Sequence, residues 1–128
     1  MPDREILWFE ATGRGDVARV GGKNASLGEM VRALAPAGVA VPPGFATTAD
    51  AYRRFVAANG LDAVLRDTLD ARAAGKITLA EAGSTIRAAF VRGDWPPETA
   101  AAIGEAYREL SRRSSIEDVD VAVRSSAT

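Results

Sequence analysis

Five stretches of this chain repeat apolar residues at helical spacing, and glycine, proline or a capping residue bounds each of them. The clearest stretch places four apolar residues at i, i+3, i+4 and i+7, namely Leu27, Met30, Val31 and Leu34. Residues at this spacing share one face of an α-helix, so the pattern predicts an amphipathic helix. Pro36 and Gly38 end it, and Asn24 or Ser26 is expected to cap its start.

The other four helices are predicted from the same criteria, with threonine caps and prolines at their starts. The first is expected to begin after Thr47 or Thr48 and to end at Asn59-Gly60, and the second to run from Leu61 to Gly75. The third begins at the T-x-x-E capping box of Thr78 and Glu81 and continues through Phe90. The fourth runs from Pro96-Pro97 to Ser114. Helices therefore dominate the predicted fold.

Three short segments have the character of extended chain. Ile6–Phe9 is an apolar run of strand length. Val39–Phe45 contains Pro42 and Pro43, which lack the amide donors of a central strand, so this segment is an edge strand or a rigid connector. Val119–Val123 alternates valine with aspartate and alanine, which is typical of a strand. Together with the helices, these segments predict an α/β (α+β) fold that is rich in helix and has a small, incomplete sheet.

Composition restricts the chemistry. The 128 residues include no cysteine and no histidine, which excludes disulfides, thiolate zinc sites, a Ser–His–Asp triad and a phosphohistidine within this chain. Sixteen basic and 17 acidic residues give a formal net charge of −1, so no global field favours nucleic acid or an anionic membrane. The N-terminal apolar run is too short for a signal peptide or a membrane span. A cytoplasmic protein is expected.

A glycine pair before the first helix is one candidate anion site. In Gly21-Gly22-Lys23-Asn24 the glycines let the backbone approach an anion, and the helix start directs amides and a positive dipole end toward it. Lys23 adds a flexible positive charge that suits a polyphosphate. The segment is not a Walker A motif, because no Ser or Thr follows the lysine. A glycine turn with a solvated lysine at its mouth explains the same residues.

The end of the predicted Val119–Val123 strand is a second candidate. Arg124 follows this strand, and strand ends are where α/β proteins present ligand-binding groups. A guanidinium suits bidentate contact with phosphate, and the hydroxyls of Ser125 and Ser126 could add donors. An ordinary arginine at a strand end is the alternative. No catalytic residue and no metal ligand is assigned within the chain.

Three blocks of sequence are more specific than these short patterns. They are V-G-G-K-N-A-S-L-G-E-M at Val20–Met30, V-P-P-G-F-A-T-T-A-D-A-Y at Val41–Tyr52 and V-A-V-R-S-S-A-T at Val121–Thr128. In their order and approximate spacing the blocks resemble the N-terminal region of the phosphoenolpyruvate synthase (pyruvate, water dikinase) family. The similarity extends over essentially the whole chain and is weakest between Asp62 and Asp118.

The resemblance implies an ATP-grasp-like nucleotide-binding domain. In this family the domain passes the β-phosphoryl group of ATP to a histidine on a separate domain, and the phosphohistidine then phosphorylates pyruvate at a third domain. ATP, pyruvate and water become AMP, phosphoenolpyruvate and phosphate, with magnesium. By position, Lys23 matches a lysine that contacts ATP phosphates and Arg124 matches a phosphate-binding arginine. The supporting residues are Gly21, Gly22, Asn24, Ser125 and Ser126.

The resemblance also implies that residues 1–128 form a single partial domain, the N-terminal section of the ATP-binding domain. The carrier histidine, the magnesium ligands and the pyruvate site belong to segments that this chain lacks. We therefore expect the full-length protein to be a kinase-type phosphotransferase and the isolated chain to be inactive. The chain ends just past the predicted strand Val119–Val123, which suggests truncation and an uncovered sheet edge through which the chain could self-associate.

Two other functions fit the same residues. A pyruvate, phosphate dikinase or a rifampicin phosphotransferase would share the nucleotide domain, although Asn24-Ala25-Ser26 and Ala46–Asp50 look more like the synthase. The other alternative is a non-catalytic module that binds nucleotide weakly or docks on a partner. A titration with ATP and magnesium would separate this last function from a surviving nucleotide site.

Overall fold

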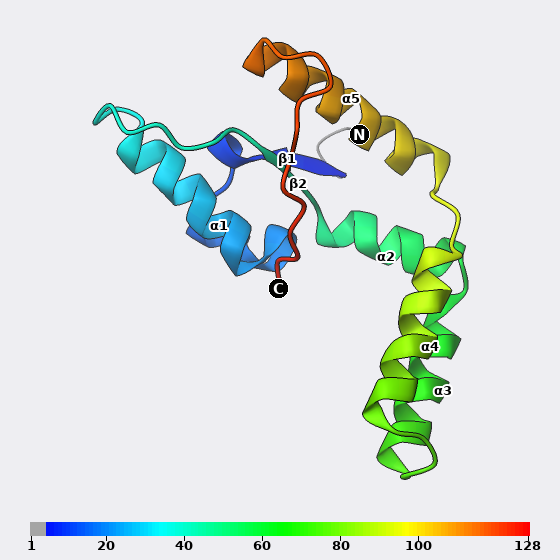
Figure 1. Cartoon of the computed structure of the whole chain (residues 1–128). Coiled ribbons are helices and arrows are strands. Elements are labelled where there is room, and N and C mark those ends of the chain that lie inside the picture. Colours follow the sequence, from blue (N-terminus) through cyan, green and yellow to red (C-terminus); the bar gives the residue numbers. More distant parts are fainter. Residues whose placement is uncertain (1–4) are drawn as a thin grey trace. The chain divides into compact units, whose positions relative to one another are not determined.

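The computed structural model describes residues 5–128 and consists mainly of helices (Figure 1). In chain order the elements are β1 (Ile6–Trp8), the short 3-10 helices η2 (Phe9–Ala11) and η3 (Arg14–Asp16), α1 (Val17–Leu34), β2 (Phe45–Thr47), α2 (Ala49–Ala58), α3 (Leu61–Ala73), α4 (Leu79–Val91) and α5 (Pro97–Ser114). The predicted α+β class is confirmed. The chain forms two compact units, one joining the part up to Tyr52 with Pro97–Thr128, the other being Arg53–Pro96.

The sheet of the first unit has two antiparallel strands. β1 pairs with β2 in the register Ile6↔Thr47, Leu7↔Ala46 and Trp8↔Phe45. The aromatic rings of Trp8 and Phe45, which face each other across the two strands, have centroids 5.4 Å apart. Such a tilted aromatic pair contributes packing energy to a two-stranded ladder that would be marginal alone.

The proline-rich segment before β2 acts as a connector. Pro42 and Pro43 lie outside the ladder, and pairing starts only at Phe45, which follows Gly44. The backbone amide of Phe9 donates to the Gly44 carbonyl at 3.1 Å. Of the two expectations for Val39–Phe45, the rigid connector is therefore right for all but its last residue, because proline cannot supply ladder donors.

Helix α5 packs on β1 through a buried polar contact as well as apolar side chains. Thr99 is fully buried and donates its hydroxyl to the Glu5 carboxylate, Oγ1 to Oε2, at 3.0 Å. Ala106 and Leu110 are buried further along the same helix. A buried carboxylate is costly unless it is hydrogen-bonded, so this contact ties the start of α5 to the residue before β1. None of the helices within residues 5–128 is long and apolar enough to cross a membrane.

The second unit is built around the predicted capping box and an aromatic core. Thr78 and Glu81 form the reciprocal pair, with Glu81 N to Thr78 Oγ1 at 3.1 Å and Thr78 N to Glu81 Oε2 at 2.8 Å, so this prediction is confirmed. The Phe55 ring stacks on Phe90 at 5.8 Å and tilts against Trp95 at 5.0 Å. This unit carries none of the predicted site residues.

The start of α1 differs from the prediction. The helix begins at Val17, earlier than expected, and breaks at Gly21, whose backbone has φ 81° and ψ 164°. Neither Asn24 nor Ser26 caps it. The side-chain amide of Asn24 instead donates to the Val20 carbonyl at 2.8 Å, bridging the break. The expected cap is therefore wrong, because Asn24 is needed to satisfy a carbonyl at the kink.

The predicted strand Val119–Val123 is also wrong, because no strand is assigned in this segment. A strand needs a neighbouring ladder, and side chains of α5 already take the backbone groups of Val119. The Tyr107 hydroxyl donates to the Val119 carbonyl at 2.8 Å, and the Val119 amide donates to Ser111 Oγ at 3.3 Å. The self-association expected from an exposed strand edge therefore lacks the strand on which it was based.

Candidate functional site

The two predicted anion-binding blocks lie together in the first unit. The backbone amide of Gly22 donates to the Ala127 carbonyl at 3.0 Å. The backbone amide of Asn24 donates to Ser126 Oγ at 3.3 Å, across 102 positions of sequence. In Figure 1 the C-terminal segment accordingly ends beside the first turns of α1. The structure thus joins residues that the sequence analysis had chosen separately.

Gly21 makes this close approach sterically feasible. It is buried, and a Cβ built on it would lie 2.5 Å from the Ser126 carbonyl oxygen. Its φ of 81° and ψ of 164° fall in a region that is essentially restricted to glycine. A glycine is therefore required here both by the backbone conformation and by the space that Ser126 occupies.

The C-terminal segment is held at its other end as well. Val119 is fixed to α5 by the Tyr107 hydroxyl at 2.8 Å and by Ser111 Oγ at 3.3 Å. Arg124 therefore lies on a short stretch of chain anchored on both sides. Ser126 follows two positions later, which corresponds to about 7 Å of extended chain.

Lys23 and Arg124 themselves remain available to a ligand. Both side chains are exposed, and within residues 5–128 neither forms an ion pair or a hydrogen bond. Lys23 stands between the two residues that bind the C-terminal segment, whereas Arg124 precedes Ser126 by two positions. Two positively charged residues without a partner within residues 5–128 thus belong to the two segments that this contact joins. Their assignment to ATP phosphates remains a prediction.

The supporting residues divide into two groups. Gly21, Gly22, Asn24 and Ser126 are all engaged in the contact between the two blocks. The sequence analysis expected amides at this helix start to be available to an anion. The amides of Gly22 and Asn24 instead donate to the chain's own C-terminal segment. Ser125 is exposed and forms no hydrogen bond within residues 5–128.

A hollow of about 330 Å³ lies on α1 next to the contact. Its wall is formed by Arg14, Val17, Gly22, Ala25, Ser26 and Glu29. The Arg14 amide donates to Glu29 Oε1 at 2.9 Å, which ties the loop before α1 to the middle of that helix. Gly22 is thus shared between this hollow and the contact with Ala127.

Thr12 is a supporting residue that the sequence analysis missed. It is fully buried, and its hydroxyl lies 2.9 Å from the Phe9 carbonyl and 3.3 Å from the Asn24 carbonyl. Its own carbonyl accepts from the Arg32 guanidinium. Helix α1 can approach the Thr12 backbone this closely only because Gly28 has no side chain. A Cβ on Gly28 would lie 2.7 Å from the Thr12 carbonyl carbon. A single threonine in a turn-rich segment carries no sequence signal for this role.

Replacing Gly28 with alanine is expected to lower the free energy of unfolding by about 1–2 kcal/mol. Overpacking against the Thr12 backbone costs about 1–3 kcal/mol, which outweighs the ~0.5–1 kcal/mol that alanine contributes inside a helix. Urea denaturation of the chain measures the change. Gly15→Ala is the control, because a Cβ there meets nothing within 4 Å. Equal stability of the two variants would contradict the close approach of Thr12.

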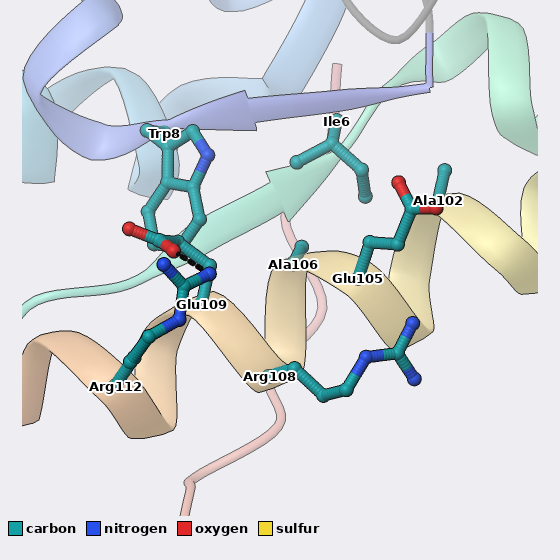
Figure 2. A pocket seen from close by; sticks show the side chains of 8 residues that line it. All are labelled: Ile6, Trp8, Ala102, Glu105, Ala106, Arg108, Glu109 and Arg112. Carbon is teal, nitrogen blue, oxygen red and sulfur yellow. Dashed lines mark ion pairs between the residues drawn. The ribbon is translucent and has the colours of Figure 1, made fainter.

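A second hollow, of about 450 Å³, lies between β1 and α5 (Figure 2). Figure 2 shows Trp8 and Ile6 on one side and a row of charged α5 side chains on the other. Glu109 forms an ion pair with Arg112, and Glu105 and Arg108 complete the charged lining, which is balanced in sign. This hollow is therefore not electropositive and contains none of the predicted site residues.

Arg113, near the end of α5, contacts Trp8 and two glutamates. Its guanidinium lies 3.8 Å from the centre of the Trp8 ring and pairs with Glu10 at 2.5 Å and Glu109 at 3.0 Å. The hydrogen bond to Glu10 has the largest effect on the pKa of Arg113, and together with the hydrogen bond to Glu109 it raises that pKa above its ordinary value. The side chain serves as a cation–π and ion-pair anchor, not as a free ligand-binding cation.

The acidic side chains of residues 5–128 do not gather into a cluster of metal-ligand size. Among residues 5–128, no group of three or more aspartates and glutamates is placed so that it could hold a metal ion. Magnesium in protein sites is held largely by carboxylates and substrate phosphates. No magnesium ligand is therefore assigned among the described residues.

Comparison with known proteins identifies the class to which this arrangement belongs. A family model described as "Pyruvate phosphate dikinase, AMP/ATP-binding domain" matches residues 17–128. The match covers both the glycine–lysine block and the C-terminal arginine block. The chain belongs to the family of pyruvate phosphate dikinase AMP/ATP-binding domains.

Within that family the chain is similar to phosphoenolpyruvate synthases, which confirms the resemblance noted in the sequence. The synthase of Escherichia coli (strain K12) is 47% identical over 124 residues, covering 96% of this chain and 15% of the relative. That of Neisseria meningitidis serogroup B (strain ATCC BAA-335 / MC58) is 44% identical over 129 residues, covering 100% and 16%. That of Synechocystis sp. (strain ATCC 27184 / PCC 6803 / Kazusa) is 47% identical over 128 residues, covering 96% and 16%. The chain thus spans about 15% of the length of these relatives.

Proposed function

We propose that this chain forms one part of the ATP site of a phosphoenolpyruvate synthase, in which Lys23 and Arg124 bind the phosphates of ATP. The whole enzyme would convert ATP, pyruvate and water to AMP, phosphoenolpyruvate and phosphate. The observation that supports the proposal most is the pair of hydrogen bonds from Gly22 and Asn24 to the segment that follows Arg124. These contacts connect the two segments that carry Lys23 and Arg124, two cations without a partner within residues 5–128.

The electrostatics of these two side chains suit a triphosphate. An ammonium group is a flexible point charge, whereas a guanidinium can contact two phosphate oxygens at once. Phosphoryl transfer needs little covalent chemistry from the protein and depends on positioning and on stabilising the charge of the transferred group. Lys23 and Arg124 would supply that charge stabilisation.

The other parts of the reaction are assigned outside these residues. The chain has no histidine, so the phosphoryl carrier would lie on another segment of the full-length protein. Magnesium ligands and the pyruvate site are proposed there too. Residues 1–128 would form the N-terminal section of an ATP-grasp-like nucleotide-binding domain in a cytoplasmic enzyme, and the isolated chain would be inactive.

Arg124→Ala tests the proposal in a full-length phosphoenolpyruvate synthase carrying this segment. We expect kcat/KM for ATP to fall by about 10²-fold, because removing one donor to a charged transition state costs this much or more. The measurement is pyruvate-dependent AMP formation. Arg66→Ala is the matched control, since Arg66 is an exposed arginine in α3 without a partner within residues 5–128. Equal activities of the two variants would refute the role of Arg124.

Pyruvate, phosphate dikinase is the second candidate, because the family description bears that name. The two reactions differ in the second phosphoryl acceptor, which is water for the synthase and phosphate for the dikinase. In the same assay, turnover without added phosphate supports the synthase. A strict requirement for phosphate, with release of pyrophosphate, supports the dikinase.

A further inference from the structure

Ser126 differs from the residues around it. It is half-buried, whereas Arg124, Ser125 and Ala127 are exposed. Its hydroxyl accepts from the Asn24 amide at 3.3 Å, and the carbonyl of the next residue accepts from the Gly22 amide at 3.0 Å. We call the four residues Gly22, Asn24, Ser126 and Ala127 the clasp.

The clasp is built into α1 and is not a loose surface contact. Gly21 adopts φ 81° directly before it, and the missing side chain of Gly21 leaves the space that the Ser126 backbone fills. Asn24 holds the break on its other side through the Val20 carbonyl at 2.8 Å. The conformation of α1 at Gly21 and the position of Ser126 therefore depend on each other.

The clasp determines where Arg124 can be. Upstream, Val119 is fixed to α5 by Tyr107 and Ser111. Downstream, the nearest fixed point is Ser126, about 7 Å of extended chain away. Without the clasp, Arg124 would have only the distant Val119 anchor, and ordering it on a ligand would cost conformational entropy.

We infer that Ser126 is a positioning residue for the ATP site: its hydroxyl binds the start of α1 and so holds Arg124 beside Lys23, and it does not bind phosphate itself. The effect on ATP rests on the proposed function, whereas the clasp exists without any ligand. Preorganised charges stabilise a transition state more than mobile ones, because no reorganisation is required at the moment of reaction.

Amide hydrogen exchange in the 128-residue chain tests the clasp alone. In Ser126→Ala we expect the Asn24 and Gly22 amides to exchange about fivefold faster, the effect of one lost hydrogen bond. Ser125→Ala is the matched control, because Ser125 is an exposed hydroxyl one position away without a partner within residues 5–128. Unchanged exchange in Ser126→Ala, or an equal increase in both variants, would overturn the clasp.

A double-mutant cycle tests the positioning role in a full-length phosphoenolpyruvate synthase carrying this segment. Ser126→Ala is expected to raise the KM for ATP about fivefold, as one weakened contact would. The control is Ser84→Ala, which removes an exposed hydroxyl of α4 that has no partner within residues 5–128 and is expected to change the KM less than twofold. In the Arg124→Ala background, Ser126→Ala should add no further increase, because it acts through Arg124. A further fivefold increase in that background would mean that Ser126 binds the nucleotide directly and would overturn the inference.

The two experiments separate the failure of each proposal. If Lys23→Ala and Arg124→Ala both leave kcat/KM for ATP unchanged, the proposed function fails and the positioning role fails with it, whatever the exchange data show. If Arg124→Ala raises the KM but Ser126→Ala does not, the proposed function stands and the positioning role is refuted. Accelerated exchange together with the non-additive cycle supports both.

Discussion

Lys23→Ala is expected to lower kcat/KM for ATP by about 10²–10³-fold in a full-length phosphoenolpyruvate synthase carrying this segment. Lys23 lies between Gly22 and Asn24, the two residues that bind the C-terminal segment, and its ammonium group has no partner within residues 5–128. A charge that is uncompensated in the free protein costs little to bring onto a polyanion. Its loss leaves that anion facing Arg124 alone.

Steady-state assays of AMP formation measure this effect, with Lys76→Ala as the control. Lys76 is an exposed lysine in the second unit, far in sequence from the clasp, so its removal should change activity less than twofold. Lys23→Arg keeps the charge and is expected to recover part of the activity. Stability should not change in any of these variants, because exposed substitutions usually alter the free energy of unfolding by less than about 0.5 kcal/mol. Near-normal turnover in Lys23→Ala would contradict its role.

Gly21→Ala is expected to lower the free energy of unfolding by about 2–6 kcal/mol, the largest effect on stability that we predict. A non-glycine residue at φ 81° and ψ 164° is strained by about 1–3 kcal/mol. The added Cβ would also lie 2.5 Å from the Ser126 carbonyl oxygen, an overpacking that costs about 1–3 kcal/mol more. The sum is a large part of the 5–15 kcal/mol that typically stabilises a whole domain.

Urea denaturation measures the change, and the adjacent glycine provides the control. A Cβ on Gly22 meets nothing within 4 Å, so Gly22→Ala should stay within about 0.5 kcal/mol of the parent chain. Exchange of the Asn24 amide separates the two causes. Accelerated exchange with a loss near 1–3 kcal/mol means that the C-terminal segment detaches and only the backbone strain remains. A variant as stable as Gly22→Ala would show that the break does not need glycine.

Local chemistry accounts for the parts of the fold that sequence reasoning predicted well. The capping box of Thr78 and Glu81 is confirmed, as is the cap at Thr48, whose hydroxyl accepts from the Ala51 amide at 3.2 Å. The ends of α1 and α2 also fall where proline, asparagine and glycine predict them. These features depend on residues within one helical turn, so no tertiary information is needed.

The errors concern groups that the sequence pattern assigns to one role and the structure uses in another. Val119–Val123 has the alternation of a strand, but Tyr107 and Ser111 take the backbone of Val119. Asn24 is a good cap by composition, but its side chain is used at the break after Val20. Met30, expected on the apolar face of α1, is 43% exposed. For Val119 a contact with another element overrides the local pattern, whereas for Asn24 a second local hydrogen bond does so.

The sequence by itself determined the helical character of the chain, its lack of any imidazole or thiol chemistry, and the two cations suited to a polyphosphate, because these follow from residue type and short-range spacing. Only the tertiary structure brought the glycine–lysine block and the segment after Arg124 into contact. Hydrogen bonds across 102 positions leave no periodic trace in a sequence. The contact also requires Gly21, whose missing side chain leaves room for Ser126, and only the folded chain shows this close approach.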